Sequence, residues 1–215
     1  MAILHAATLT PTKAEIIASW LPTRPWAPAA GDGNGNGGLE LVGAYRFDDP
    51  VGQVGIEGHL VRWNSVLLHV PLTYRNAPLA GADDYLLGTM QHSALGERWV
   101  YDGVGDPVFT RMLTAAAMTG TGQAVGLVEF KERWLVVPTN VRLAGGGWGL
   151  DRVAVDGLVV EDVDDECTVL RNDGIELRVA RRPLVGTRAP ISLRATWPGQ
   201  DEPVTLAEVR ASSAA

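Results

Sequence analysis

Apolar and polar residues alternate most clearly between Leu39 and Tyr101. Within this region, hydrophobic side chains recur at every second position, a period of two residues that is typical of β-strands with one buried face. The pattern predicts three consecutive strands, at 41–47, 54–60 and 66–74, and two further ones at 85–90 and 97–101.

Turn-forming residues separate the first three of these strands. Asp48-Asp49-Pro50 and Trp63-Asn64 are the expected turns. Short connections of this kind join antiparallel neighbours, so the region is predicted to be an antiparallel meander. One face should pack on a helix, and the other should face solvent or a partner.

Two helices are predicted from their starts and ends. Thr12 and Glu15 have the spacing of a capping box, Ile16 and Trp20 lie on one apolar face, and Pro22 stops the helix. We expect this short helix to lie on the sheet.

The second helix should start at Asp106, with proline at its first position, and end at Gly120. After Gly120 the chain again favours strands. Eight are expected, at 123–130, 133–138, 140–144, 157–160, 166–170, 175–181, 191–197 and 203–209.

The predicted fold class is therefore α+β: an antiparallel sheet with a packed N-terminal helix, followed by a second β-rich antiparallel domain. We expect residues 1–120 to form the first domain and 121–210 the second. Residues 27–38 are mostly Gly, Asn and Ala and should form a flexible linker loop. Residues 211–215 should form a disordered tail.

The composition excludes several classes of function. The 215 residues carry a net charge of −7 with no basic run, so neither nucleic acid nor a membrane surface is an expected partner. One cysteine, Cys167, allows neither an internal disulfide framework nor a cysteine-based zinc site. There is no recognisable secretory signal or membrane-spanning segment, so we expect a cytoplasmic protein.

Four polar residues in two adjacent strands are candidate ligand-binding residues: Glu57, His59, His69 and Arg75. If the strands pair so that their apolar positions share a face, His59 and His69 come close together. Two imidazoles and a carboxylate could bind a divalent metal or shuttle a proton. The alternative is a solvated sheet face on which Glu57 and Arg75 pair weakly.

Other candidates are weaker. His92 follows an apolar strand, and Trp99 is one of several tryptophans, with Trp26, Trp63 and Trp148, that could stack on a sugar ring. Core packing is the alternative for the tryptophans. The acidic pairs Asp48-Asp49 and Asp83-Asp84 and the acidic stretch 162–166 are typical of solvated turns.

Several of these stretches, taken together, resemble the N-terminal cap domain of actinobacterial maltokinases. The resemblance covers about the first 110 residues and is carried by Thr10-Pro11-Thr12-Lys13, Trp20-Leu21-Pro22, Arg24-Pro25-Trp26, 45–57, 70–75, 88–92, 98–103 and Asp106-Pro107. It implies that residues 1–120 are a cap built from a helix on a curved sheet in a cystatin-like arrangement. In that family the cap precedes a kinase-like lobe that phosphorylates a sugar with ATP and magnesium.

The catalytic residues that the family requires are not found in these 215 residues. A kinase lobe should bring a His-x-Asp loop, and none of His5, His59, His69 and His92 is followed by Asp at the second position. The strand 175–182 is faintly similar to one that carries a nucleotide-binding lysine, but it has Arg178 and Ala180 instead. We therefore assign no catalytic residue, and we expect no cofactor and no metal.

These observations favour a non-catalytic accessory or regulatory protein linked to α-glucan, maltose, trehalose or glycogen metabolism. It would bind a partner enzyme or a small sugar ligand. Two alternatives stay open. One is a subunit of a split ATP-dependent sugar kinase, completed by a kinase-like lobe in trans. The other is an enzyme with an unfamiliar site, either around Glu57, His59 and His69 or on the tryptophan-rich surface.

Overall fold

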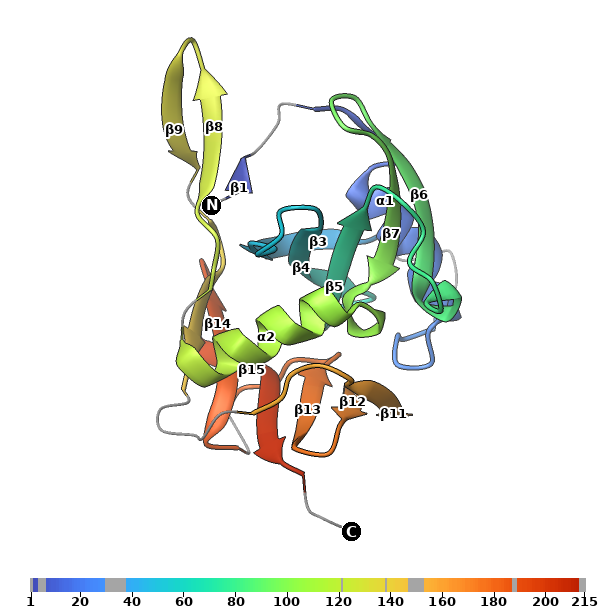
Figure 1. The fold of residues 1–215 in the computed structure, drawn as a ribbon, viewed down its shortest axis with the longest axis vertical. Coiled ribbons are helices and arrows are strands. Elements are labelled where there is room, and N and C mark those ends of the chain that lie inside the picture. The colour runs from blue at the N-terminus through green and yellow to red at the C-terminus, as the bar shows by residue number, and fades with distance from the viewer. Residues whose placement is uncertain are drawn as a thin grey trace.

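The computed structural model describes residues 2–3, 7–29, 38–120, 122–137, 139–146, 153–186 and 189–212. The chain is mostly antiparallel β-sheet with two α-helices (Figure 1), which confirms the predicted α+β class. The predicted linker 27–38 and tail 211–215 lie largely outside the described residues.

The first sheet is a curled antiparallel sheet of six strands. Its order across the sheet is β2 (Leu9–Thr10), β6 (Leu86–His92), β7 (Gly96–Asp102), β5 (Val66–Arg75), β4 (Gly55–Trp63) and β3 (Glu40–Phe47). All five strands predicted between Leu39 and Tyr101 are present. The cystatin-like detail stays a prediction.

Helix α1 (Lys13–Trp20) packs on one face of the first sheet, as the sequence predicts. The Thr12 and Glu15 capping box starts it, and the short 3₁₀ helix Leu21–Thr23 follows directly, with Pro22 at its second position. Ile17 and Trp20 are buried among apolar residues of β4, β5, β6 and β7. Their burial, more than the intrinsic helix propensity of eight residues, stabilises this short helix.

The second sheet also has six antiparallel strands, drawn below the first in Figure 1. Its order is β10 (Arg142–Gly145), β14 (Ile191–Trp197), β15 (Gln200–Ala211), β13 (Ile175–Ala180), β12 (Cys167–Arg171) and β11 (Val159–Val163). A third, small sheet contains β1 (Ala2–Ile3), β8 (Gly126–Phe130) and β9 (Arg133–Val137). All eight strands predicted after Gly120 are confirmed.

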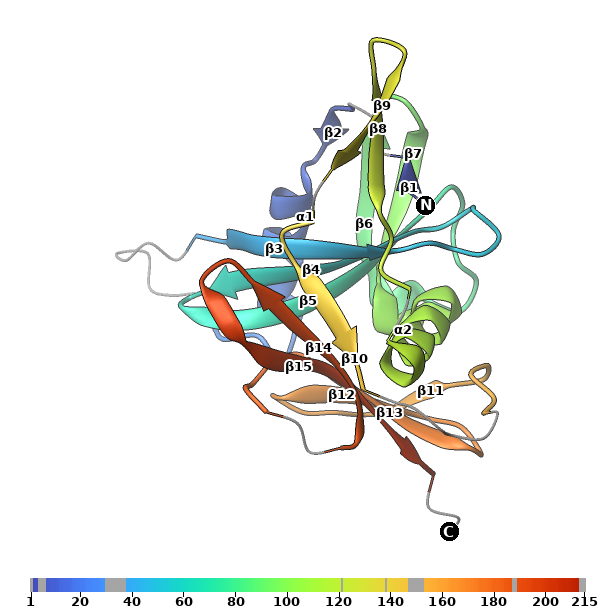
Figure 2. The same cartoon turned by 90° about the vertical axis from the view of Figure 1, so that its left-hand side faces the viewer.

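Helix α2 (Pro107–Thr119) lies between the first and second sheets (Figures 1 and 2). Asp106 caps its start and Gly120 ends it in a left-handed conformation, as predicted. Its side chain Leu113 belongs to one hydrophobic cluster with Leu60 of the first sheet and Leu177 of the second. The two halves therefore share a core, and their separation into domains 1–120 and 121–210 stays a prediction.

The pairing of β4 with β5 differs from the predicted register. The hairpin loop is the two-residue turn Asn64-Ser65, both with positive φ, so that Trp63 pairs with Val66. With this register, even-numbered positions of β4 share a face with odd-numbered positions of β5. The apolar residues of the two strands consequently face opposite sides, and both faces need a cover.

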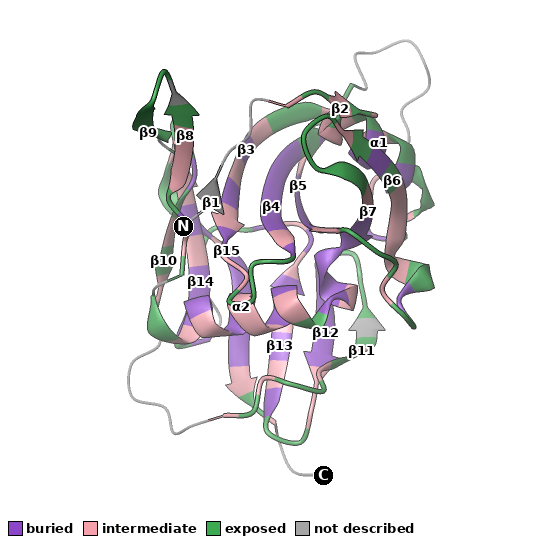
Figure 3. Ribbon diagram, turned by 45° about the horizontal axis from the view of Figure 1, so that its top comes forward, coloured by how far each residue is buried: buried purple, intermediate pink, exposed green. Residues whose placement is uncertain are grey.

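Both faces are in fact covered. Figure 3 shows β4 and β5 as buried along most of their length. One face packs on α1, and the other contributes Ile56 and Leu60 to the cluster shared with the second sheet. The expectation that one face meets solvent or a separate partner is therefore wrong for these strands, because the C-terminal half of the same chain covers it.

Candidate functional site

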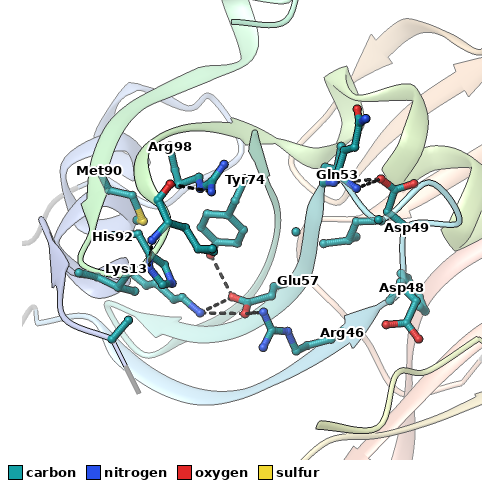
Figure 4. Close-up of a pocket in the computed structure, with 18 residues that line it drawn as sticks. Lys13, Arg46, Asp48, Asp49, Gln53, Glu57, Tyr74, Met90, His92 and Arg98 are labelled. Atoms are coloured by element: carbon teal, nitrogen blue, oxygen red, sulfur yellow. Dashed lines mark hydrogen bonds and ion pairs between the residues drawn. The ribbon is translucent and has the colours of Figure 1, made fainter. Parts of the chain in front are cut away.

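A pocket of about 560 Å³ opens on the side of the first sheet that carries α1. Strands β3 to β5 form one wall, and β2, the start of α1 and the β6–β7 hairpin contribute the other (Figure 4). The lining residues are Ala7, Leu9, Lys13, Arg46, Phe47, Asp48, Asp49, Gly52, Gln53, Val54, Gly55, Ile56, Glu57, Tyr74, Met90, His92, Leu95 and Arg98. We call this cavity the Glu57 pocket.

The Glu57 carboxylate is the centre of the polar network in the pocket (Figure 4). It is 3% exposed and lies 2.8 and 2.6 Å from the ammonium group of Lys13, measured from Oε1 and Oε2. Arg46, directly opposite on β3, reaches Oε1 at 2.9 Å. Two cations from separate elements thus hold one buried carboxylate.

Two further groups donate to the same carboxylate. The Tyr74 hydroxyl donates to Oε2 at 3.0 Å, and Nε2 of His59 lies 3.0 Å from that oxygen. His59 is 4% exposed and lies behind Glu57 rather than in the pocket lining. Both carboxylate oxygens of Glu57 therefore accept from donors of the protein, and these contacts hold the side chain in place without a ligand.

The protonation state of Glu57 follows from these neighbours. Burial alone would raise its pKa, but the hydrogen bond with His59 and the charges of Lys13 and Arg46 outweigh burial and hold the pKa well below its usual range. Burial and the neighbouring Glu57 charge raise the pKa of Tyr74 well above its ordinary value. At neutral pH the pocket thus presents a carboxylate and a neutral phenol, so Glu57 cannot act as a general acid.

The loop between β3 and β4 lines one part of the pocket. Asp49 organises this loop by accepting hydrogen bonds from the backbone amides of Val51, Gln53 and Val54 at 3.0, 2.8 and 2.9 Å. The prediction of a turn at Asp48-Asp49-Pro50 is confirmed. The loop places the Gln53 side chain beside the cavity (Figure 4).

The β6–β7 hairpin supplies the opposite polar wall. Nδ1 of His92 accepts from the backbone amides of Ala94 and Leu95, each at 3.2 Å, which closes the hairpin turn. Arg98 donates from Nη2 to the Leu95 carbonyl at 2.8 Å. Its Nε is buried and has no hydrogen-bond partner within the described ranges.

The lining carries equal numbers of positive and negative side chains. The positive side chains are Lys13, Arg46 and Arg98, and the negative ones are Asp48, Asp49 and Glu57. The lining also includes apolar residues such as Met90. A lining with donors, acceptors and apolar surface but balanced charge suits a neutral polar molecule better than a polyanion.

The candidate ligand-binding residues predicted from the sequence do not all lie in the Glu57 pocket. Glu57 and His92 line the pocket, and His59 supports Glu57 from behind. Arg75 instead forms a two-pronged ion pair with Asp106, at 2.7 and 2.8 Å, and so anchors the start of α2. The predicted weak pair between Glu57 and Arg75 on a solvated face is wrong, since Glu57 is buried and pairs with Lys13 and Arg46.

His69 lies on the other face of the sheet. His59 pairs with Val70, and His69 pairs with Leu60, so the two imidazoles point to opposite sides. Nδ1 of His69 donates to the Ala180 carbonyl at 3.0 Å, and Nε2 accepts from the Tyr45 hydroxyl at 2.8 Å. The expected imidazole pair is therefore not formed, because the two-residue turn shifts the register by one.

The surroundings of His69 join the two sheets. Its backbone amide donates to the carbonyl of Arg181 at 2.9 Å, and the Arg181 guanidinium forms a buried two-pronged pair with Asp102. The guanidinium also lies over the ring of Trp26, 4.7 Å from its centre. We call this set the sheet junction; its members are His69, Asp102, Arg181 and Trp26.

Of the four tryptophans considered as sugar-stacking residues, two are buried in the core. Trp26 and Trp63 are 2% and 6% exposed, which removes them as stacking surfaces for a sugar. Trp99 is half-buried on β7, beside Arg75 and outside the pocket lining. Trp148 lies outside the described residues. The core-packing interpretation therefore holds for Trp26 and Trp63.

Among the polar lining residues, sequence reasoning missed Lys13, Arg46, Gln53, Tyr74 and Arg98. Arg46 could have been predicted, because it lies on the same face as Glu57 once β3 and β4 are paired. Lys13 and Arg98 could not, since they come from elements whose position depends on the curl of the whole sheet.

No group of three or more His, Cys, Asp or Glu side chains in the described ranges is placed to hold a metal ion. Likewise, none of the described helices combines the length and apolar character needed to cross a membrane.

Comparison with known families identifies the region that contains most of this pocket. Residues 20–106 match the family model of the maltokinase N-terminal cap domain. The match confirms the resemblance inferred from the sequence. No curated protein gives a significant match to the chain.

Proposed function

We propose that this protein is a non-catalytic accessory or regulatory protein of maltose or trehalose metabolism, and that it binds a small neutral sugar in the Glu57 pocket. The observation that carries the proposal is the charge-balanced, preorganised pocket within a region that matches a maltokinase cap. The family match supplies the metabolic link. The pocket supplies the ligand chemistry.

Size and chemistry both support a sugar. A cavity of about 560 Å³ falls within the range of small-molecule sites, which is roughly 300–1,000 Å³. Sugar hydroxyls donate and accept hydrogen bonds, and the lining offers partners for both, with carboxylates and amides beside cations. The apolar side chains of Leu9 and Met90 offer surface for the C–H face of a ring.

Arg98 is the residue best suited to recognise the ligand. Its buried Nε has no partner among the described residues, and a buried donor left unsatisfied costs roughly 1–3 kcal/mol. If the guanidinium turns towards the cavity on binding, a sugar hydroxyl that accepts from this Nε would recover that cost. Lys13 and Arg46, by contrast, are already engaged by Glu57.

The same geometry argues against catalysis at this site. Glu57 is ionised and fully hydrogen-bonded, and His59 and His69 lie on opposite faces of the sheet. The enzyme alternative placed its site either around Glu57, His59 and His69, which do not come together, or on a tryptophan-rich surface, from which Trp26 and Trp63 are withdrawn by burial. An accessory role is therefore the better proposal.

Titration calorimetry with maltose, trehalose and glucose tests the proposal. We expect one of these sugars to bind, and Arg98→Met to weaken its binding about tenfold by removing the guanidinium while keeping the apolar stem. Arg62→Met, on an exposed position of β4 outside the pocket, is the matched control and should bind like the original protein. Absence of heat with all three sugars at millimolar concentration would refute sugar binding.

A kinase-like lobe in trans is a second candidate role. It is favoured by a cap match in 215 residues that contain no His-x-Asp loop. Affinity co-purification with and without ATP, magnesium and maltose tests it; a stoichiometric partner carrying that loop would support a split sugar kinase. A cytoplasmic location and a link to glycogen stay predictions.

A further inference from the structure

The β8–β9 hairpin extends away from the two large sheets (Figures 1 and 2) and ends in the strand β9. Strand β9 is the outer strand of its sheet, since β8 separates it from β1. All five of its residues are exposed, and four of them in succession are large and apolar: Trp134, Leu135, Val136 and Val137. No other described strand exposes four consecutive residues of this kind.

Two other outer strands, β11 and β3, are protected against pairing with another strand. Strand β11 carries Glu161 and an irregularity in its pairing beside Val160. The edge of β3 is capped by Asn140, whose side chain accepts from the Ala44 amide and donates to the Val42 carbonyl. Charges, bulges and covering groups are the usual devices that block edge-to-edge pairing.

Beyond Arg133 at its start, strand β9 shows none of these devices among the described residues. Its pairing with β8 is regular from Arg133 to Val137, and no charged residue lies between Arg133 and Pro138. Alternate residues of an outer strand direct their N–H and C=O groups away from the sheet, where a further strand can use them. The β9 edge is therefore open to strand addition.

We propose that β9 is a self-association surface, on which β9 of a second copy adds in antiparallel orientation with the two Leu135 residues at the two-fold axis. In this register Trp134 of each copy faces Val136 of the other, and Arg133 faces Val137. Pairs of aromatic and β-branched side chains stabilise antiparallel strands, and no like charges are placed opposite each other. Two three-stranded sheets would then become one of six strands.

The charge distribution favours a second copy at this place. The protein carries a net charge of −7, so two copies repel each other over most of their surface. Residues 129–137 carry two acidic residues, Glu129 and Glu132, and two basic ones, Lys131 and Arg133, so the hairpin end is neutral. At this neutral end, two copies can approach without repulsion between like local charges.

The proposed contact between the two β9 strands is short and should therefore be weak. Pro138 has no N–H and follows β9 directly, so the paired segment is limited to about five residues. Such a contact is below the roughly 1,200 Å² of a standard stable interface. We therefore expect a dimer that dissociates on dilution.

Sedimentation velocity over a concentration series from about 5 to 500 µM tests the proposal. The full chain should shift from monomer to dimer, and Val136→Lys should stay monomeric across the series because it puts a charge on the open edge. Val159→Lys is the matched control: it makes the same change on another outer strand, at a valine of similar exposure (63% against 65%). It should dimerise like the original protein.

A second variant tests the register. Leu135→Cys should form a disulfide-linked dimer under mild oxidation, whereas Val159→Cys should not; the native Cys167 is buried. A monomer at every concentration, equal loss of dimer in both lysine variants, or equal cross-linking of both cysteine variants would overturn the proposal. A different protein bound at β9 in place of a second copy would also overturn it. None of these outcomes bears on sugar binding in the Glu57 pocket.

Discussion

The Glu57 pocket and the sheet junction are each built around an ion-paired acid, Glu57 on β4 and Asp102 on β7, but the two networks differ in their access to water. In the Glu57 pocket the acid is buried, while its cations Lys13 and Arg46 are about 30% exposed. In the sheet junction both partners are buried, with Arg181 and Asp102 exposed by 2% and 5%. One network opens onto a cavity, and the other is sealed between two sheets.

This difference separates a binding role from a structural one. A cation with about a third of its side chain exposed can exchange part of its contacts for those of water or a ligand at low cost, since water already solvates it in part. A sealed pair cannot exchange partners without opening the core, and loss of one partner leaves a buried charge. We therefore expect mutations in the junction to affect mainly stability, and mutations in the pocket to affect mainly binding.

The largest expected effect is that of Arg181→Met. It leaves Asp102 as an uncompensated buried charge and removes the guanidinium from the ring of Trp26. We expect the free energy of unfolding to fall by about 3–5 kcal/mol in urea titrations. Arg181→Met combined with Asp102→Asn should recover part of this loss; a loss below 1 kcal/mol in the single variant would contradict a sealed junction.

The second effect is a dependence of stability on pH through His69. Burial and the charge of Arg181 lower the pKa of His69 to about 3, from an ordinary value of 6.5. Between these values the unfolded chain binds a proton that the folded chain does not, so stability is complete above pH 6.5 and declines as the pH falls. The loss from pH 7 to pH 5 should be about 2 kcal/mol.

His69→Gln isolates this contribution. The variant should be less stable at pH 7, because the Tyr45 hydroxyl and the Ala180 carbonyl lose their partner. Its stability should nevertheless change less than that of the original protein between pH 7 and pH 5. Identical slopes in urea titrations at the two pH values would show that His69 is not kept neutral by the fold.

The smallest effect on stability is expected in the pocket. Glu57→Gln should cost about 1–2 kcal/mol, since Lys13 and Arg46 can turn towards water when the carboxylate is lost. Glu40→Gln is the control: Glu40 pairs with Arg62 on the surface, so the change should stay within about 0.5 kcal/mol. If Glu57→Gln cost as much as Arg181→Met, the contrast between the pocket and the sheet junction would be lost.

Local signals were enough to predict most of the fold. The capping box of Thr12 and Glu15, the Asp106 cap and the terminal Gly120 each fix a helix end within a few residues, and all three are confirmed. Strand positions follow from alternation in the same way. Signals of this kind depend on neighbours in sequence, which a single chain displays.

The pocket could not be predicted in the same way, because it depends on register and on curl. The two-residue turn at Asn64-Ser65 places His59 and His69 on opposite faces of the sheet. If the pairing moved by one residue, the two side chains would share a face. Lys13 reaches Glu57 only because α1 lies against the curled sheet. The spacing of residues along the sequence does not predict the contact between Lys13 and Glu57.

The core shared by both sheets has a consequence during synthesis. Leu60 and Leu113 are fully buried in a cluster completed by strands that follow residue 140, including Leu177. The ribosome adds about 5–20 residues per second, so the apolar side of the first sheet waits on the order of 5–20 s for its cover. A nascent chain of this protein is therefore expected to depend on chaperones until its last strands emerge.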